Sequence, residues 1–274
     1  MWYHHGVNPL RRVKNQLSFL TVWVEKVGVP ATASRLRLRI RKALGMHPET
    51  WSVRPRQVQH TLTVRLGDSS DMDVFSQIFI SEEYRTLKSL REVTVFLDLG
   101  ANVGFASAYL LNCFPKARVI SVEPDDRNVV ICRANLSPYK DRARVLHGAV
   151  WAKRTALQVS QGSYGDGREW ATQVSEPPEG AEGSVQAWDM SSLIEMAGVD
   201  KVDLLKVDIE RAELAVFDDS AKAWLPNVRN ICIELHGPDC EDAFFAALAG
   251  FDYELSYSGE FTICKDIRQK ALAN

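Results

Sequence analysis

Apolar and polar positions from residue 94 onward follow two alternating patterns. Short apolar runs with strand character are separated by stretches in which apolar residues recur with helical spacing. Regular alternation of this kind predicts right-handed crossovers and a mostly parallel sheet, and therefore an α/β fold. The expected strands are 94–99, 118–122, 144–150, 204–207 and 230–235, with helices at 103–113, 127–136 and 241–248.

The end of the chain departs from this alternation. Strands expected at 251–257 and 261–265 flank the turn Ser258-Gly259, which predicts an antiparallel hairpin at the edge of the sheet. A second departure lies between the strands expected at 155–160 and 184–189. The intervening segment is rich in Gly, Pro and Glu and is predicted to be a flexible excursion, in which Tyr164 and Trp170 are candidates for substrate contacts.

Upstream of residue 91 the pattern predicts two smaller units. Residues 51–90 are expected to form a hairpin (52–66) and a helix, capped by Ser70 or Asp71, that packs as a lid on a domain spanning 91–274. Within this lid, Glu83 and Tyr84 are candidates to line a cleft. Residues 1–50 are expected to be a basic and largely helical extension, although the alternation in 35–42, RLRLRIRK, equally suits a strand.

Charge is distributed unevenly along the 274 residues. The formal net charge is −2, but residues 1–66 hold twelve Lys/Arg against two Asp/Glu, so the remainder is strongly acidic. For residues 35–42, a solvated basic face is preferred over a site that binds an anion. For residues 8–27, a helix packed on the domain is preferred over one that lies on a membrane surface. The apolar run 17–24 is far shorter than the roughly 20 residues that span a bilayer, and Glu25-Lys26 argues against a signal peptide.

The five cysteines are scattered and show no C-x-x-C spacing. This arrangement argues against a disulfide framework and against a zinc site. A reducing cytoplasmic setting is therefore expected.

Candidate chemistry begins in the stretch TVFLDLGANVG, residues 94–104. A strand runs through Asp98 into a turn that carries Gly100, Asn102 and Gly104 and then opens a helix. Backbone N–H groups and a helix N-terminus suit a carboxylate or phosphate. The spacing lacks the G-x-G-x-x-G of dinucleotide sites, and Asp98 would repel a pyrophosphate but accept hydrogen bonds from an ammonium group. A zwitterionic amino-acid tail, such as that of S-adenosylmethionine, satisfies both halves of the turn.

The next two strand ends supply candidates for the rest of such a cofactor. Glu123-Pro124 follows the second strand, where a carboxylate can accept hydrogen bonds from a ribose diol. Val150-Trp151 follows the third strand, where Trp151 either supplies a flat wall for adenine or is a core residue.

The fourth and fifth strands end in acidic residues and a histidine. Asp208 ends the fourth strand, and Glu210 and Glu213 are expected to begin the helix after it; Glu234 and His236 end the fifth strand. Asp208 is predicted to face the same crevice as Asp98 and Glu123, and Glu234 and His236 are predicted to lie at the same edge of the sheet. Asp208 or His236 is the predicted general base, oriented by Glu210 and Glu234, and no metal is required.

Several of these motifs together resemble one family. DLGANVG, VISVEP, AVW, LLKVDIERAE and IELHG, over roughly residues 50–265, resemble the FkbM family of S-adenosylmethionine-dependent methyltransferases. The resemblance implies a Rossmann-like seven-stranded methyltransferase sheet and methylation of hydroxyl groups on sugars, polyketides and other secondary metabolites. The acceptor would then be a small molecule, a glycan or a lipid-linked molecule.

One residue departs from the family pattern, and rival functions remain. Arg211 stands where the family usually has glycine, so either the turn accommodates a side chain or the arginine contacts substrate. A non-catalytic S-adenosylmethionine-binding partner of a biosynthetic complex is one rival, and a nicotinamide-dependent oxidoreductase is another. A nucleic-acid partner is not expected, because the fourth strand ends in VDIE and not in the N/D-P-P-aromatic turn that holds a flipped base.

Overall fold

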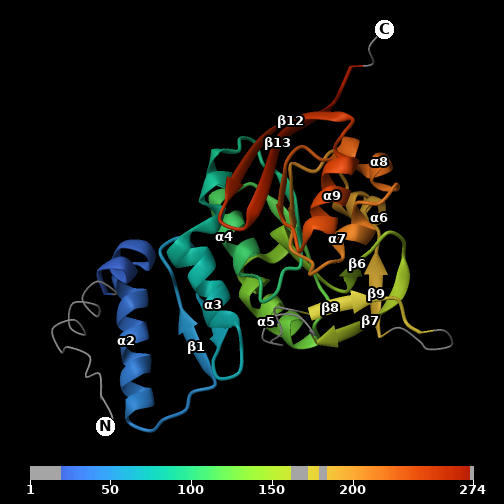
Figure 1. Cartoon of the computed structure of the whole chain (residues 1–274). Helices are drawn as coiled ribbons and strands as arrows, with labels where there is room; N and C mark the ends of the chain where they lie inside the picture. Colours follow the sequence, from blue (N-terminus) through green and yellow to red (C-terminus); the bar gives the residue numbers. More distant parts are fainter. Residues whose placement is uncertain (1–19, 162–171, 179–183, 272–274) are drawn as a thin grey trace, which may run out of the picture.

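A seven-stranded sheet forms the centre of the molecule. The computed structural model describes residues 20–161, 172–178 and 184–271. The strand order is β12-β13-β11-β10-β3-β4-β5, and the fold is the predicted Rossmann-like α/β fold (Figure 1). The parallel strands are β3 (Val95–Leu99), β4 (Arg118–Glu123), β5 (Ala143–His147), β10 (Leu204–Val207) and β11 (Ile231–Glu234). The antiparallel hairpin β12 (Phe251–Ser258) and β13 (Phe261–Gln269) closes one edge, as expected.

Both faces of this sheet are buried, because helices cover them. Phe96 of β3 packs into one hydrophobic cluster, whereas Val95, Leu97 and Leu99 pack into another on the opposite face. One face carries α4 (Phe105–Cys113), α5 (Asp126–Leu136) and the short η3 (Ser137–Arg142). The other carries α6 (Met190–Ala197), α7 (Glu213–Val216), α8 (Ala221–Trp224), η5 (Leu225–Asn227) and α9 (Pro238–Ala247).

The strand expected at 144–150 is in fact two strands. It divides at Gly148, after which β6 (Ala149–Val150) pairs with β9 (Val185–Trp188) in a second sheet. A Cβ at Gly148 would lie 2.6 Å from the carbonyl oxygen of Gln186, so glycine is needed where the chain crosses to this sheet.

The second sheet has the order β6-β9-β7-β8. Its other members are β7 (Thr155–Gln161) and β8 (Thr172–Ser175). The excursion after residue 160 therefore contains a strand that was not predicted. Tyr164 and Trp170, the candidates for substrate contacts, lie outside the described residues.

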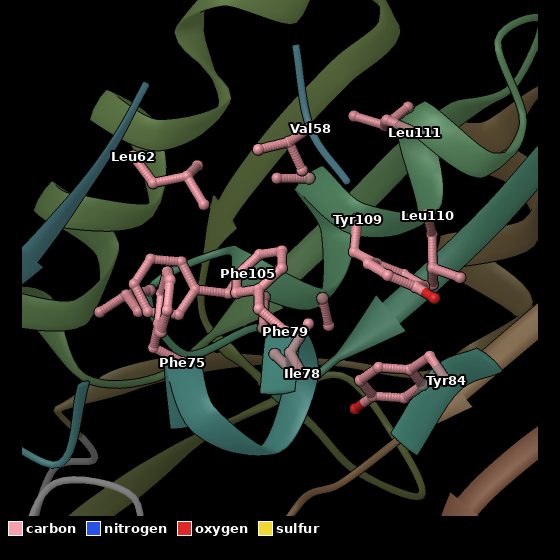
Figure 2. Packing of buried hydrophobic residues seen from close by; sticks show 14 of the residues in the cluster. Val58, Leu62, Phe75, Ile78, Phe79, Tyr84, Phe105, Tyr109, Leu110 and Leu111 are labelled. Carbon is pink, nitrogen blue, oxygen red and sulfur yellow. The ribbon is translucent and has the colours of Figure 1, made fainter. Parts of the chain in front are cut away.

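The lid consists of a hairpin and three short helical segments. They are β1 (Thr50–Val53), β2 (Leu62–Arg65), α3 (Asp71–Ser76), the π-helical η1 (Gln77–Ser81) and the 3-10 segment η2 (Glu83–Ser89). Figure 2 shows Phe75 and Phe79 of the lid packed beside Phe105 and Tyr109 of α4. These contacts fix the lid against the sheet.

Ser70, one of the two predicted caps, is the N-cap residue of α3, but its side chain makes no cap hydrogen bond. Asp71 is the first residue of the helix and does not cap it. The buried carboxylate of Asp71 instead pairs with Arg65 at 2.7 Å, and the Arg65 guanidinium also donates to Asn128 of α5. The pair connects the hairpin to α3, and the bond from Arg65 to Asn128 connects the hairpin to α5.

Residues 20–27 and α2 (Val29–Ala43) are helical, so the stretch RLRLRIRK is a helix and not a strand. Trp23, Val27 and Leu38 are buried in the same cluster as the lid. Within the described residues, no helix is both long and apolar enough to cross a bilayer. The proposed divisions at residues 50 and 90 stay predictions.

Candidate functional site

A cavity of about 310 Å³ lies at the carboxyl ends of the parallel strands. The turns after β3, β4, β10 and β11 line it, and the lid closes one side through Ile78, Glu83 and Tyr84. Nine of the twelve predicted site residues line this cavity. They are Gly100, Asn102, Glu123, Pro124, Val150, Asp208, Glu210, Glu234 and His236.

The glycine turn after β3 owes its shape to its neighbour β10. Gly100 has φ 76, and a Cβ built on it would lie 1.7 Å from the carbonyl oxygen of Asp208. Only a residue without a side chain allows the two turns to approach so closely. Asn102, with φ 49, continues the turn in the left-handed region and directs its backbone N–H toward Glu123. The two chemical motifs of the sequence therefore meet at one point.

Glu123 joins the turns that follow β3 and β4. Its buried carboxylate accepts hydrogen bonds from the backbone N–H groups of Asn102 (2.8 Å) and Asp125 (3.0 Å), and from the side-chain amide of Asn128. Burial outweighs these donors and raises the pKa of Glu123 to about 7. Its contact with a ribose diol stays a prediction.

Asp98 does not face the cavity, which corrects the prediction that it contacts the ligand. It is fully buried beneath the glycine turn, and its Oδ2 accepts a hydrogen bond from Ser107 at 2.6 Å. Its Oδ1 lies 3.1 Å from the Nζ atom of Lys206. Because these neighbours occupy the carboxylate, Asp98 supports the turn from below.

Gly104 and Trp151 also lie outside the cavity lining. Gly104 is the N-cap of α4 with φ 80, and a Cβ there would lie 3.0 Å from the sulfur of Cys132. Trp151 packs against the small cluster around Leu157 and Val185 in the second sheet. The neighbouring Val150 lines the cavity in its place. The core alternative for Trp151 is therefore the one that the structure supports.

At the other end of the cavity, carboxylates surround His236. The Nε2 atom of His236 lies 3.6 Å from Glu234, 3.7 Å from Glu210 and 3.9 Å from Asp208. On its other side, Nδ1 lies 2.8 Å from the carboxylate of Glu213, which is fully buried. We call Asp208, Glu210, Glu234 and His236 the acidic cluster.

The protonation of this cluster differs from that of isolated groups. Burial alone would lower the pKa of His236, but Glu213, Asp208 and Glu210 outweigh it and raise the pKa to about 9. A raised pKa favours the imidazolium form, which donates protons and does not accept them. The role of His236 as general base stays a prediction, and Asp208 is the alternative that this charge favours. Burial and nearby carboxylates raise the pKa of Glu234 to about 8 and that of Glu210 to about 7.

The turn after β10 is held by Arg211. Glu210 and Arg211 have φ of 46 and 74, so Glu210 precedes the helix and does not begin it as expected. The Arg211 guanidinium donates to the carbonyl oxygen of His236 at 2.9 Å and pairs with the carboxylate of Asp239. Since Arg211 does not line the cavity, the turn accommodates a side chain at this position and uses it to fix the loop that carries His236.

Lys206 is a site residue that the sequence analysis missed. Its Nζ atom donates to the carbonyl oxygen of Gly100 at 2.7 Å and lies 3.5 Å from Asp208. Burial would lower the pKa of Lys206, but Asp98 and Asp208 raise it, so it stays a cation between the two motifs. The available signal was a charged residue inside the otherwise apolar strand LLKV, because a buried lysine requires partners.

The acidic cluster also has the composition of a metal site. Asp208, Glu234 and His236 each offer one ligand atom, and these atoms lie within 4.8 Å of one another. Oxygen and imidazole ligands suit several divalent cations. The expectation that no metal is required stays a prediction.

Two curated relatives match parts of the chain. The AMB antimetabolite synthetase AmbE of Pseudomonas aeruginosa is 27% identical over 234 residues, which cover 73% of this chain and 11% of AmbE. The 2-O-methyltransferase NoeI of Sinorhizobium fredii is 30% identical over 146 residues, which cover 47% of this chain and 59% of NoeI. The chain thus matches little more than half of NoeI and a small part of AmbE.

Among solved structures, the chain is similar to a putative caffeoyl-CoA O-methyltransferase from Staphylococcus aureus. The TM-score is 0.41 at 9% identity, with 93% of this chain and 99% of that chain covered. A likeness this distant bears on neither activity nor substrate.

The family model described as the methyltransferase FkbM domain matches residues 98–260, which is more than half of the chain. The matched region begins in β3 and includes the glycine turn, Glu123, Lys206 and the whole acidic cluster. The chain therefore belongs to the FkbM family of methyltransferases, and its cofactor is S-adenosylmethionine.

Proposed function

We propose that this protein transfers the methyl group of S-adenosylmethionine to a hydroxyl oxygen of a sugar, a glycolipid or a secondary metabolite. The observation that carries the proposal is the position of Asp208. Its partly exposed carboxylate lies in the same cavity as the glycine turn and Glu123. A carboxylate there can accept the proton of an attacking hydroxyl group. The partial relative NoeI is a 2-O-methyltransferase, which supports oxygen as the acceptor atom.

The residues present suit this cofactor. The glycine turn offers backbone N–H groups to a carboxylate, and Glu123 can accept hydrogen bonds from hydroxyl groups. A sulfonium carries positive charge, and the cavity is lined by more carboxyl groups than basic groups. The carboxyl groups are those of Glu83, Glu123, Asp208, Glu210, Glu234 and Glu260, and the basic groups are those of Lys206 and His236.

When bound, S-adenosylmethionine supplies an electrophilic methyl group, so this chain needs to orient an acceptor and remove one proton. We assign the proton to Asp208. A hydroxyl oxygen that accepted this methyl group would lose its proton, and the Asp208 carboxylate would accept that proton. Lys206 and His236 approach the two oxygens of that carboxylate, at 3.5 and 3.9 Å, and hold it in place.

The carboxyl groups around Asp208 limit which class of acceptor molecule can bind there. Glu83, Glu234 and Glu260 join Asp208 around this part of the cavity, and burial raises the pKa of Glu83. An anionic acceptor would add like charge, whereas neutral hydroxyl groups can donate hydrogen bonds to these carboxylates. We therefore place uncharged, hydroxyl-rich acceptors before phosphorylated or carboxylated ones.

The test is methyl transfer from labelled S-adenosylmethionine to a panel of acceptors. Neutral sugars, glycolipids and hydroxylated metabolites are compared with amine acceptors and with sugar phosphates. We expect product only with neutral hydroxyl acceptors, and mass and NMR spectra locate the new methyl group on oxygen. Transfer to nitrogen alone would contradict O-methylation. Tight cofactor binding by calorimetry without transfer to any acceptor would favour the non-catalytic partner.

A further inference from the structure

The outer face of α2 carries apolar side chains that the fold does not bury. Because the segment is a helix, Leu38 points inward and is buried, whereas its neighbours on the opposite face point outward. Val29, Leu36 and Ile40 are 64%, 46% and 52% exposed, and Leu44, one turn further, is 72% exposed. Their spacing places all four on one side of the helix. We call these four residues the outer stripe.

Exposed apolar residues are concentrated in this part of the molecule. Of the eleven large hydrophobic residues that are exposed in the described part of the chain, seven lie between Val22 and Met46. Single exposed apolar residues are ordinary, but a continuous row on one helix face indicates an interaction surface. In Figure 1, α2 lies at the periphery, with β1 and α3 between it and the rest of the molecule.

Basic side chains flank the outer stripe. Arg37 and Arg41 are exposed and follow Leu36 and Ile40 directly in the sequence. Lys42 is also exposed, and no acidic residue occurs between Lys26 and Pro48. A helix with an apolar face and flanking basic residues has the chemistry of an interfacial helix on anionic lipids. The charge of this surface is opposite to that of the acidic body.

We propose that α2 lies flat on an anionic membrane surface. The outer stripe enters the boundary between headgroups and acyl chains, and Arg37 and Arg41 contact lipid phosphates. A second copy of the chain is a poorer occupant, since a symmetric contact through the stripe would bring these arginines close to their own copies. The proposal does not depend on the identity of the methyl acceptor.

The experiment is co-flotation of the full chain with vesicles. One set is phosphatidylcholine alone, and the other is equal parts phosphatidylcholine and phosphatidylglycerol. We expect binding to the anionic vesicles and little to the neutral ones. Each basic residue is worth about fivefold in partitioning, so R37Q/R41Q should weaken binding roughly 25-fold. L36S/I40S should weaken it by at least about tenfold.

The matched control is Val130→Ser, which removes from α5 an apolar side chain that is even more exposed, at 64%, than Leu36 and Ile40. It should bind the anionic vesicles as the wild type does. Melting temperature and cofactor affinity show that each variant is folded, since none of the substituted residues lines the cavity.

Three results would overturn the proposal. The first is equal flotation of the wild type and L36S/I40S. The second is a dimer of the wild type in solution that L36S/I40S converts to a monomer, because the stripe would then face a second copy. The third is a full chain that does not float until residues 1–19 are deleted, which would assign the stripe to that segment.

Discussion

The two ends of the cavity offer different chemical groups to a ligand. We call the end near β3 and β4 the cofactor end and the end near β10 and β11 the acceptor end. The end near β3 and β4 uses backbone N–H groups, a glycine turn and Glu123, whose carboxylate accepts three hydrogen bonds from the protein. The end near β10 and β11 uses side chains only, and three carboxylates share the imidazolium of His236 on its Nε2 side. At the first end, the protein itself supplies hydrogen-bond partners to the carboxylate of Glu123. The second end holds more carboxyl groups than cations, and the raised pKa values of Glu210 and Glu234 keep part of these groups protonated near neutral pH.

This difference indicates what each end does. A site whose donors and acceptors are already fixed by the fold can be pre-organised for one constant ligand. A crowded, partly exposed cluster changes its protonation with pH and with what binds to it. This difference supports the proposal that the end near β3 and β4 recognises the cofactor and that the end near β10 and β11 transfers the proton.

The largest effect is expected where the two ends meet. In Gly100→Ala the new Cβ would lie 1.7 Å from the carbonyl oxygen of Asp208, which is backbone and cannot swing away. We expect the strands to separate at the cavity, with loss of at least about 3 kcal/mol of stability and no measurable cofactor binding. Thermal melting and calorimetry measure the two effects.

Gly198→Ala is the matched control for this substitution. Gly198 also has positive φ, at 62, but open space surrounds its Cβ position. It should cost only about 1 kcal/mol through backbone strain. Equal losses in the two variants would show that strain, and not the approach of β10, makes Gly100 necessary.

The second largest effect is expected for Asp208→Asn, which should impair catalysis without impairing cofactor binding. The amide keeps the shape of the side chain but accepts no proton, so kcat should fall about 10²–10⁴-fold. Cofactor affinity should change less than about threefold, because the turn and Glu123 remain in place. Asp242→Asn, an exposed substitution on α9, is the control and should leave both values unchanged. A normal kcat in Asp208→Asn would remove Asp208 from the reaction.

Lys206→Met tests the cation that connects the ends. It leaves Asp98 buried without its counter-charge, and breaking such a pair costs about 3–5 kcal/mol. Adding Asp98→Asn to Lys206→Met should restore much of that stability, since Ser107 can still donate to the amide oxygen. Urea unfolding of both single variants and the double variant gives the coupling energy. Strictly additive losses would mean that the two residues do not interact.

Glu123→Gln is a smaller change confined to the cofactor end. It replaces charge-assisted hydrogen bonds by neutral ones, and cofactor Kd should rise about ten- to a hundredfold. The kcat at saturating cofactor should change little. The control Asp126→Asn is exposed and lies in the same segment. A fall in kcat with an unchanged cofactor Kd would mean that Glu123 acts in the chemical step and not in cofactor binding.

The sequence predicts the fold well, because strand, turn and helix patterns are local. The parallel strands and the hairpin lie within a few residues of their expected bounds, and the break at Gly148 was missed because its cause, the approach of Gln186, is distant in sequence. A strand in 172–175 was missed because composition favoured a loop.

The site was predicted less completely than the fold. A motif places Asp98 and Asp208 on neighbouring strands, but it does not say which way each side chain points. Asp98 points away from the cavity to Lys206 and Ser107. The protonation of His236 depends on Glu213, a residue that the sequence indicated only as the start of a helix. Such pairings arise in three dimensions and leave no local pattern.

The smallest effect expected is the pH dependence of stability. The pKa of His236 is raised from 6.5 to about 9, and that of Glu234 from 4.5 to about 8. A folded-state pKa above the unfolded value adds stability that is complete below the unfolded pKa and lost as pH rises through the folded one. Stability should therefore fall between about pH 5 and pH 9. In Glu234→Gln the carboxylate no longer titrates, so thermal melting across this range should give a flatter curve, close to that of the wild type near pH 5 and above it near pH 9. A Glu234→Gln curve parallel to that of the wild type would mean that the acidic cluster is neutralised in solution by something other than its own protons, and added divalent cations would then be the next variable to change.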